Sequence, residues 1–367
     1  MRVGIYSPCL SAYGDGEKYI GKIAEILARE NDVEFLIEKG PSTSELEDRL
    51  SLDLANIGFN NIRVSSPLLS KKNYFLSRLT KDYDLFVNQE HFSSIRSKAR
   101  MSISIQEVPP TRLNFPSYNP IHKIFFDPKL NTYDKIVTNS NFTKKWIEEW
   151  YKRTPEVLYP PVDTNQFIPL SKKRFILSVG RFFVGGHCKK QLEMIKTFKE
   201  LSHNGIQDWE FHLVGSVDNS NHDRAYLEKC QEEARGNSIY FHVNASVNVL
   251  KELYGRSKIF WCATGLGENG YPDKMEHFGI STIDAMSAGC VPAVIGKGGQ
   301  PEIVRNNIDG FCWNSIEELK SLTLKLANDD VLLRKMSESS IERSKHFGMN
   351  VFERRVRKTF SQVACAN

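Results

Sequence analysis

Two carboxylates flank a glycine in the second half of the sequence, in a pattern that suits a hydroxylated and phosphorylated ligand. Asp284 follows Glu276 by eight residues, just over two helical turns, so both side chains can face one side of an element at different depths. Such carboxylates can accept hydrogen bonds from two different groups, one a sugar and the other a ribose. Gly279 lets the backbone approach a ligand, and the N–H groups that open the following helix suit a diphosphate or a sugar hydroxyl.

Three cations lie in one predicted loop further upstream. Arg181 follows the apolar run 174–180, and Lys189 and Lys190 open the next helical segment. Because strand ends and helix starts meet at one edge of a parallel sheet, these cations can converge on a diphosphate, arginine as a planar fork and lysine as a point charge. The alternatives are a loop of solvated charges and, for the carboxylates, a helix cap with a solvated side chain.

Segment 275–304 resembles the family 4 retaining glycosyltransferases, which have the GT-B fold. Their signature is Glu, seven residues, then Glu, with Phe-Gly following the first, and this chain has Phe278-Gly279 in that place, then Ala-Met-x-Ala-Gly and Val-Pro. The resemblance implies that Glu276 holds the donor hexose and that the backbone of residues 278–280 lies beside sugar and phosphate. Asp284 would bind the ribose diol, with a looser or water-mediated contact because aspartate is one methylene shorter than glutamate. The donor-binding residues expected in this segment are His277, Phe278, Gly279, Ile280 and Asp284.

The resemblance extends to the cation loop. In the family, an arginine after this strand and a lysine before this helix neutralise the leaving nucleotide diphosphate, which stabilises the transition state electrostatically. Arg181 matches the arginine. By its distance from Phe198, Lys189 matches the lysine better than Lys190 does, and the long loop leaves the register of the two lysines open.

Two further loops fit the resemblance as donor-binding segments. Val243 and Asn244 follow an apolar run where the family's base-binding loop falls, and backbone contacts to the nucleobase are expected there. Gly14 and Gly16 stand between the first predicted strand and helix, like the family's N-terminal glycine loop that approaches the donor phosphates. The sequence after Gly16 lacks the third glycine of a dinucleotide-binding motif.

One expected residue is absent from the first half. Many family members carry a histidine near the donor sugar, after a strand in the middle of the first domain, whereas the comparable segment here has Gln106 and Glu107. His91 is the nearest substitute as a catalytic group, with a purely structural histidine as the alternative. The mechanism favoured for the family needs no protein base, because the leaving phosphate can take the acceptor's proton on the same face. Positioning and charge stabilisation would then carry most of the catalysis.

Alternating strand and helix patterns must position these residues. Short apolar runs alternate with helical periodicity along the whole chain, which predicts an α/β protein with two doubly wound domains and a cleft between them. The resemblance implies that these are the two Rossmann-like domains of the GT-B fold, which face a central cleft. The predicted domains are residues 1–162 for the acceptor and 174–345 for the nucleotide-sugar donor. A proline-rich linker, 163–173, separates them, and a final helix at 346–367 returns to the first domain.

Composition excludes several classes of protein. The 367 residues include 49 Lys and Arg against 44 Asp and Glu, a net charge of +5 that is too small to indicate nucleic-acid binding. We interpret the first residues as a strand and a turn and not as a signal peptide, no apolar run is long enough to span a membrane, and the seven scattered cysteines suggest reduced thiols. We therefore expect a cytoplasmic protein that is either free or peripheral at the inner face of a membrane. The resemblance implies no metal site and no cofactor beyond a nucleotide-diphosphate sugar.

The expected partners are a GDP- or UDP-sugar donor and a glycan or lipid-linked acceptor. The motifs Tyr-Pro-Pro-Val-Asp and Glu-His-Phe-Gly most resemble those of family members that use GDP-mannose. Basic and apolar residues in segments 66–84 and 119–130 suggest either contact with an anionic bilayer or a core-facing amphipathic helix and a loop. The competing function is a catalytically inactive GT-B protein that binds a nucleotide sugar or glycan.

Overall fold

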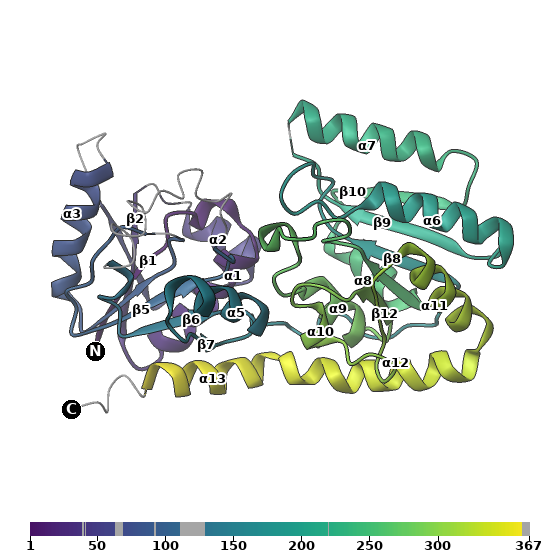
Figure 1. Ribbon diagram of the computed structural model, residues 1–367. Coiled ribbons are helices and arrows are strands. Elements are labelled where there is room, and N and C mark those ends of the chain that lie inside the picture. Colours follow the sequence, from purple (N-terminus) through teal and green to yellow (C-terminus); the bar gives the residue numbers. More distant parts are fainter. Residues whose placement is uncertain are drawn as a thin grey trace. The chain divides into compact units, whose positions relative to one another are not determined.

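The computed structural model describes residues 1–38, 40, 42–62, 69–91, 93–110, 129–218 and 220–361. The chain divides into two compact units (Figure 1). Unit 1 comprises Met1–Pro161 and Asn350–Asn367, and unit 2 comprises Val162–Met349. Segment 163–173, which we predicted to be a linker, lies within unit 2, where Lys172 Nζ donates to the carbonyls of Ser257 and Ala288 at 2.7 and 2.6 Å.

Unit 1 is built on a seven-stranded sheet with the order β3-β2-β1-β4-β5-β6-β7, in which every neighbouring pair is parallel. Its strands are β1 (Arg2–Tyr6), β2 (Asp32–Ile37), β3 (Ile57–Asn61), β4 (Leu85–Asn88), β5 (Met101–Gln106), β6 (Lys135–Thr138) and β7 (Glu156–Val157). Its helices are α1 (Asp15–Ala28), α2 (Thr43–Leu50), α3 (Leu69–Leu79), α5 (Asn141–Tyr151) and α13 (Met349–Ser361), with short 3-10 turns at Leu10–Ala12 and Thr80–Asp82.

Unit 2 is built on a six-stranded parallel sheet with the order β10-β9-β8-β11-β12-β13, the doubly wound order of Rossmann folds. Its strands are β8 (Phe175–Val179), β9 (Glu210–Gly215), β10 (Ile239–Val243), β11 (Ile259–Cys262), β12 (Val291–Ile295) and β13 (Phe311–Trp313). Its helices are α6 (Gln191–Asn204), α7 (Asn221–Ala234), α8 (Val247–Arg256), α9 (Ile280–Ser287), α10 (Gln300–Ile303), α11 (Ile316–Asn328) and α12 (Asp330–Ser344), with 3-10 turns at Pro272–Lys274 and Lys345–Phe347.

The predicted fold class is confirmed. Both sheets are parallel, and in each the strand order changes direction next to one strand, β1 in unit 1 and β8 in unit 2. Serine caps set where several helices begin. The Ser140, Ser220 and Ser246 hydroxyls accept from backbone N–H groups in the first turns of α5, α7 and α8, which satisfies donors that the helix leaves unpaired. The sequence pattern did not indicate β3, β7 or β13, because β3 contains a glycine and two asparagines and the other two have only two and three residues.

The last helix of the described chain packs on unit 1. In α13, Phe352, Val356 and Phe360 are buried, and the Phe352 ring lies 5.8 Å from that of Tyr19 in α1. Glu353 forms an ion pair with Arg29 at 2.6 Å. Figure 1 shows this helix in yellow beneath the strands β6 and β7. None of the helices within the described residues combines the length and apolar character needed to cross a membrane.

Candidate functional site

Three loops in unit 2 lie close to the predicted cations and to the segment that contains Glu276. Residues 180–190 follow β8, residues 263–279 follow β11, and residues 296–299 follow β12. β8, β11 and β12 are adjacent in the sheet, and the strand order reverses next to β8, so these loops leave the carboxyl edge at the topological switch point. Ligands bind at this point in open α/β sheets.

The loops bring Lys189 and Glu276 together. Lys189 Nζ donates to Glu276 Oε2 at 2.6 Å, and the two side chains are only 22% and 15% exposed. Burial by itself would raise the pKa of Glu276. The charge and hydrogen bond of Lys189, with smaller contributions from His187 and His277, outweigh burial and bring this pKa down to about 2. Glu276 is therefore an ionised hydrogen-bond acceptor held against a cation.

The predicted helical relationship between Glu276 and Asp284 is wrong. α9 begins at Ile280, so Glu276 lies in the loop before the helix and only the half-buried Asp284 lies on it. Gly279 has a φ of 124°, and a side chain there would stand 2.7 Å from the Gln300 amide nitrogen. This positive φ turns the chain sharply between Glu276 and the first turn of α9.

Neighbouring side chains in this segment have different surroundings. Phe278 is 4% exposed and packs edge-on against Phe347 with 5.8 Å between ring centroids, so only its backbone is offered to a ligand. His277 is 7% exposed and contacts His187 edge-on, with ring centroids 4.4 Å apart and an interplanar angle of 84°. His187 was not among the predicted site residues, and the sequence held no signal for it beyond its place in the cation loop.

A glycine pair supports the backbone beneath Glu276. The Gly299 N–H donates to the Glu276 carbonyl oxygen at 2.8 Å. A Cβ on Gly298, which has a φ of 66°, would lie 2.1 Å from that same oxygen, and a Cβ on Gly299 would lie 2.5 Å from the His277 carbonyl oxygen. Both positions therefore require glycine, and they hold the loop that carries Glu276.

The other two predicted cations of unit 2 lie in the same loop as Lys189. Arg181 is 58% exposed, with its guanidinium 5.2 Å from the Phe183 ring centroid and 3.9 Å from Asp218. Lys190 has a φ of 59° at the N-cap of α6, and its Nζ donates to Glu268 Oε1 at 2.7 Å. Lys190 thus tethers the 263–279 loop, while Lys189 faces Glu276.

The predicted base-binding residues Val243 and Asn244 lie at the end of β10. Val243 is half-buried, and the exposed Asn244 has a φ of 53° and donates its N–H to the Gly215 carbonyl oxygen at 2.9 Å. Gly215 at the end of β9 also lies close to β8, since a Cβ there would stand 2.1 Å from the Gly180 carbonyl oxygen. Gly215 therefore contacts both the backbone at the start of the cation loop and the backbone of Asn244.

The N-terminal glycine loop lies in unit 1. The Gly14 N–H donates to Glu17 Oε2 at 2.8 Å, so the side chain that caps α1 already occupies this donor. The Gly16 carbonyl oxygen accepts from Gln89 Nε2 at 2.7 Å, and that nitrogen also donates to Glu107 Oε2 at 2.9 Å. The loop is thus joined to the carboxyl ends of β4 and β5 by a polar network.

Two titratable groups in unit 1 have strongly shifted pKa values. Burial lowers the pKa of His91 to about 4, against the opposing effect of its hydrogen bond with Gln106, so this imidazole is neutral at pH 7. Burial raises the pKa of Glu107 to about 7, with Gln89 opposing the shift and the charges of Glu17 and Asp15 adding to it. Glu107 therefore stands where a family histidine was expected and titrates near neutral pH.

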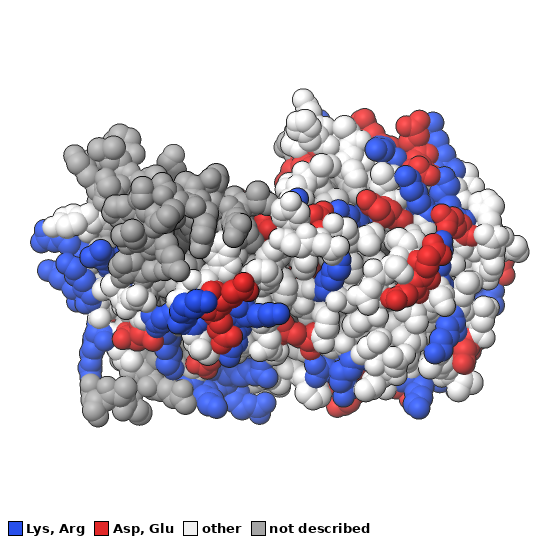
Figure 2. Space-filling model, viewed as in Figure 1, with Lys and Arg blue, Asp and Glu red and all other residues white. Residues whose placement is uncertain are grey.

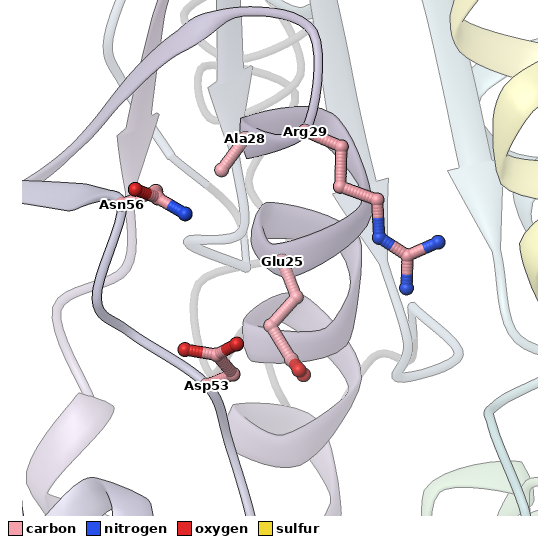
Figure 3. A pocket seen from close by; sticks show the side chains of 5 residues that line it. All are labelled: Glu25, Ala28, Arg29, Asp53 and Asn56. Carbon is pink, nitrogen blue, oxygen red and sulfur yellow. The ribbon is translucent and has the colours of Figure 1, made fainter.

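A small pocket in unit 1 lies away from these residues. It has a volume of about 70 Å³ and is lined by Glu25, Ala28, Arg29, Asp53 and Asn56, between α1 and the loop that precedes β3 (Figure 3). None of the predicted site residues lines it. Within the described ranges, no group of three or more His, Cys, Asp or Glu side chains could hold a metal ion.

Comparison with solved structures agrees with the observed fold. A glycosyltransferase from Rickettsia africae ESF-5 superposes with a TM-score of 0.71 at 17% identity, covering 100% of this chain and 99% of that one. HepE from Anabaena, in complex with UDP and glucose, superposes with a TM-score of 0.75 at 12% identity, covering 99% and 100%. At these identities the likeness concerns the fold, which is of the GT-B type.

Sequence comparison identifies the family. The alpha-1,3/1,6-mannosyltransferase ALG2 of Dictyostelium discoideum is 24% identical over 245 residues, which are 57% of this chain and 56% of that protein. The chain thus spans about half the length of the curated relatives it matches. The family model described as "Glycosyl transferases group 1" matches residues 163–346, which is half of the chain and nearly all of unit 2. This protein therefore belongs to the group 1 family of glycosyl transferases.

Proposed function

We propose that this protein is a retaining hexosyltransferase, which moves mannose from GDP-mannose to a hydroxyl of a glycan or lipid-linked acceptor. The observation that carries the proposal is the half-buried ion pair of Lys189 and Glu276, in the loops that lead into α6 and α9. The proposal assigns phosphate binding to the lysine, and the carboxylate beside it can accept hydrogen bonds from sugar hydroxyls. The choice of mannose is supported by the ALG2 mannosyltransferases among the relatives and by the motifs Tyr-Pro-Pro-Val-Asp and Glu-His-Phe-Gly.

In the proposed reaction, Lys189 and Arg181 bind the diphosphate and Glu276 accepts hydrogen bonds from the hexose. The bond between the anomeric carbon and the diphosphate oxygen breaks, and the two cations neutralise the charge that develops on the leaving oxygen. The acceptor oxygen bonds to the anomeric carbon from the same face. Its proton passes to the departing phosphate oxygen, so that no protein base is needed and the configuration is retained.

Other predicted residues have positioning roles in this proposal. The N–H groups that open α9 face the phosphate and sugar, Asp284 binds the ribose diol, and the loop at Val243 and Asn244 contacts the base. Because Lys189 and Arg181 supply positive charge to the diphosphate, the proposed reaction uses no metal ion. Addition of EDTA should therefore leave the rate unchanged.

We further propose that unit 1 binds the acceptor at an anionic, cytoplasm-facing membrane surface. In α3, Leu76 is buried and Lys72 pairs with Glu38, so this side of the helix faces the core. Tyr74 and Phe75 on the other side are 64% and 45% exposed. Figure 2 shows Lys and Arg side chains gathered at the edge of unit 1 where α3 lies in Figure 1. Residues 119–128 of the second predicted membrane segment lie outside the described residues.

Donor screening tests the proposed function. GDP, UDP, GDP-mannose and UDP-glucose are titrated into the full chain, and binding is followed by thermal shift and calorimetry. We expect GDP-mannose to bind and to be hydrolysed slowly or transferred to a mannosyl acceptor, and Glu276→Ala and Arg181→Ala to weaken both effects. Preference for UDP-glucose would correct the donor. Tight binding with no turnover for any acceptor or water would favour the inactive binding protein, and no binding by any nucleotide would refute the transferase.

A further inference from the structure

His187 occupies the centre of the cation loop of unit 2. The loop leaves β8 at Arg181 and enters α6 after Lys190, so His187 stands between the two ends that carry the predicted phosphate-binding groups. Its neighbours Gly185 and Gly186 are exposed, whereas His187 itself is half-buried. The loop therefore directs this one imidazole inward, toward the rest of the site.

The contacts of His187 are with the segment that contains Glu276. Its ring meets the His277 ring edge-on with centroids 4.4 Å apart. His277 is the residue directly after Glu276, so the imidazole packs on the same loop that presents the carboxylate to the ligand. This contact joins the loop after β8 to the loop after β11 independently of the Lys189–Glu276 ion pair.

Charged groups from both the loop after β8 and the loop after β11 affect the pKa of His187. Burial lowers the pKa of His187 below its usual value. The carboxylate of Glu276 opposes this, the cations Lys189 and Arg181 lower the pKa further, and Asp273 raises it slightly. Without ligand, the imidazole is therefore neutral at pH 7 in a field of two cations and two carboxylates.

We propose that His187 is a further contact for the donor diphosphate, which donates a hydrogen bond to a phosphate oxygen and takes up a proton when the donor binds. The inference rests on the proposed donor site. A diphosphate bound by Lys189 and Arg181 brings two negative charges close to the imidazole, which oppose the effect of burial and offset the two cations that lower its pKa further. An added anion favours the charged form of a neighbouring histidine, and a protonated imidazole donates from both ring nitrogens.

Proton uptake makes donor affinity depend on pH in a definite direction. The pKa of His187 is low in the free protein and rises in the complex, so between these two values binding is coupled to protonation. Donor affinity should therefore fall as pH rises through this window, by up to about tenfold per pH unit where a full proton is taken up. A nucleotide sugar is the right probe, because its two phosphates have no proton that titrates near pH 7, whereas the terminal phosphate of GDP does.

Calorimetry on the unmodified protein measures this uptake directly. GDP-mannose, or UDP-glucose if only that donor binds, is titrated at pH 7 in two buffers that differ in ionisation enthalpy. We expect the observed enthalpies to differ in the sense of proton uptake, with a net uptake of a substantial fraction of one proton. Donor binding with no net uptake would overturn the role of His187 and leave the proposed function intact. Failure of both donors to bind would instead refute the proposed function.

Variants then assign the proton to its residue. His187→Gln keeps a hydrogen-bond donor that cannot become charged, and His203→Gln, on the far end of α6, is the matched control. We expect His187→Gln to abolish the uptake and to weaken donor binding about three- to tenfold at pH 6.5, with little effect at pH 8.5. His203→Gln should behave as the unmodified protein does. Retained uptake in a folded His187→Gln protein would assign the proton elsewhere and contradict the proposal.

Discussion

Lys189 Nζ lies 2.6 Å from Glu276 Oε2, and the two residues are 87 positions apart in the chain. Each group therefore serves as the partner of the other, so that neither of these two half-buried charges is left uncompensated. A nucleotide sugar can replace both partners, because its phosphate accepts from Lys189 and its hydroxyls donate to Glu276.

The lysine register can be tested by two adjacent substitutions. Lys189→Ala should lower kcat by about 10²-fold or more, because it removes the cation that stabilises the leaving diphosphate and leaves Glu276 without its partner. Lys190→Ala should cost less than about tenfold, since Lys190 is bound to Glu268 and acts on the loop. Steady-state kinetics with the identified donor measure both effects. A larger loss for Lys190→Ala would reverse the assignment of the two lysines.

Gly298 should be intolerant of any side chain. In Gly298→Ala, the new Cβ would meet the Glu276 carbonyl oxygen, so we expect a loss of about 3 kcal/mol or more in the free energy of unfolding and a large loss of activity. Gly236→Ala is the matched control, because its φ is 76° but nothing lies within 4 Å of the new atom. It should cost only about 1 kcal/mol of backbone strain. Denaturant unfolding measures both values, and equal costs would contradict a clash at Gly298.

Glu107 should make stability depend on pH near neutrality. Its pKa is raised to about 7 in the folded protein, above that of the unfolded chain, so its favourable contribution is complete at pH 4 and lost as pH rises through 7. Glu107→Gln keeps the acceptor for Gln89 without the charge. The variant should be more stable than the unmodified protein by about 3 kcal/mol at pH 8 and equally stable at pH 4. Thermal unfolding at both pH values would refute this if the difference did not change.

The exposed side of α3 should control membrane contact. We expect the unmodified protein to float with liposomes that contain anionic lipid, and Phe75→Asp to remove most of that binding, because it loses apolar area and adds a repelled charge. Val331→Asp is a control with a similarly exposed apolar residue, in α12 of unit 2. A protein that stays at the bottom of the gradient in every case does not bind such membranes through this helix.

The sequence by itself determined the fold class and most of the elements of this protein. The periodicity of apolar residues specified strands such as β1 and β8 and helices such as α6, because alternation and helical spacing are local properties of the chain. The motif from Glu276 to Asp284 is also a local property of the chain, and it indicated the family. The strands β3 and β13 were not predicted, because β3 contains a glycine and two asparagines and β13 has only three residues.

Only the tertiary structure decided which groups meet. Nothing in the sequence pairs Lys189 with Glu276 or Lys190 with Glu268, because those contacts depend on the order of β8 and β11 in the sheet and on the path of two loops. The chain turns at Gly279, which has a positive φ, so Glu276 lies in the loop before α9 and is not at helical spacing from Asp284. The inward position of His187 and the shifted pKa of Glu107 arise from burial, which is a property of the packed protein and not of residue type or spacing.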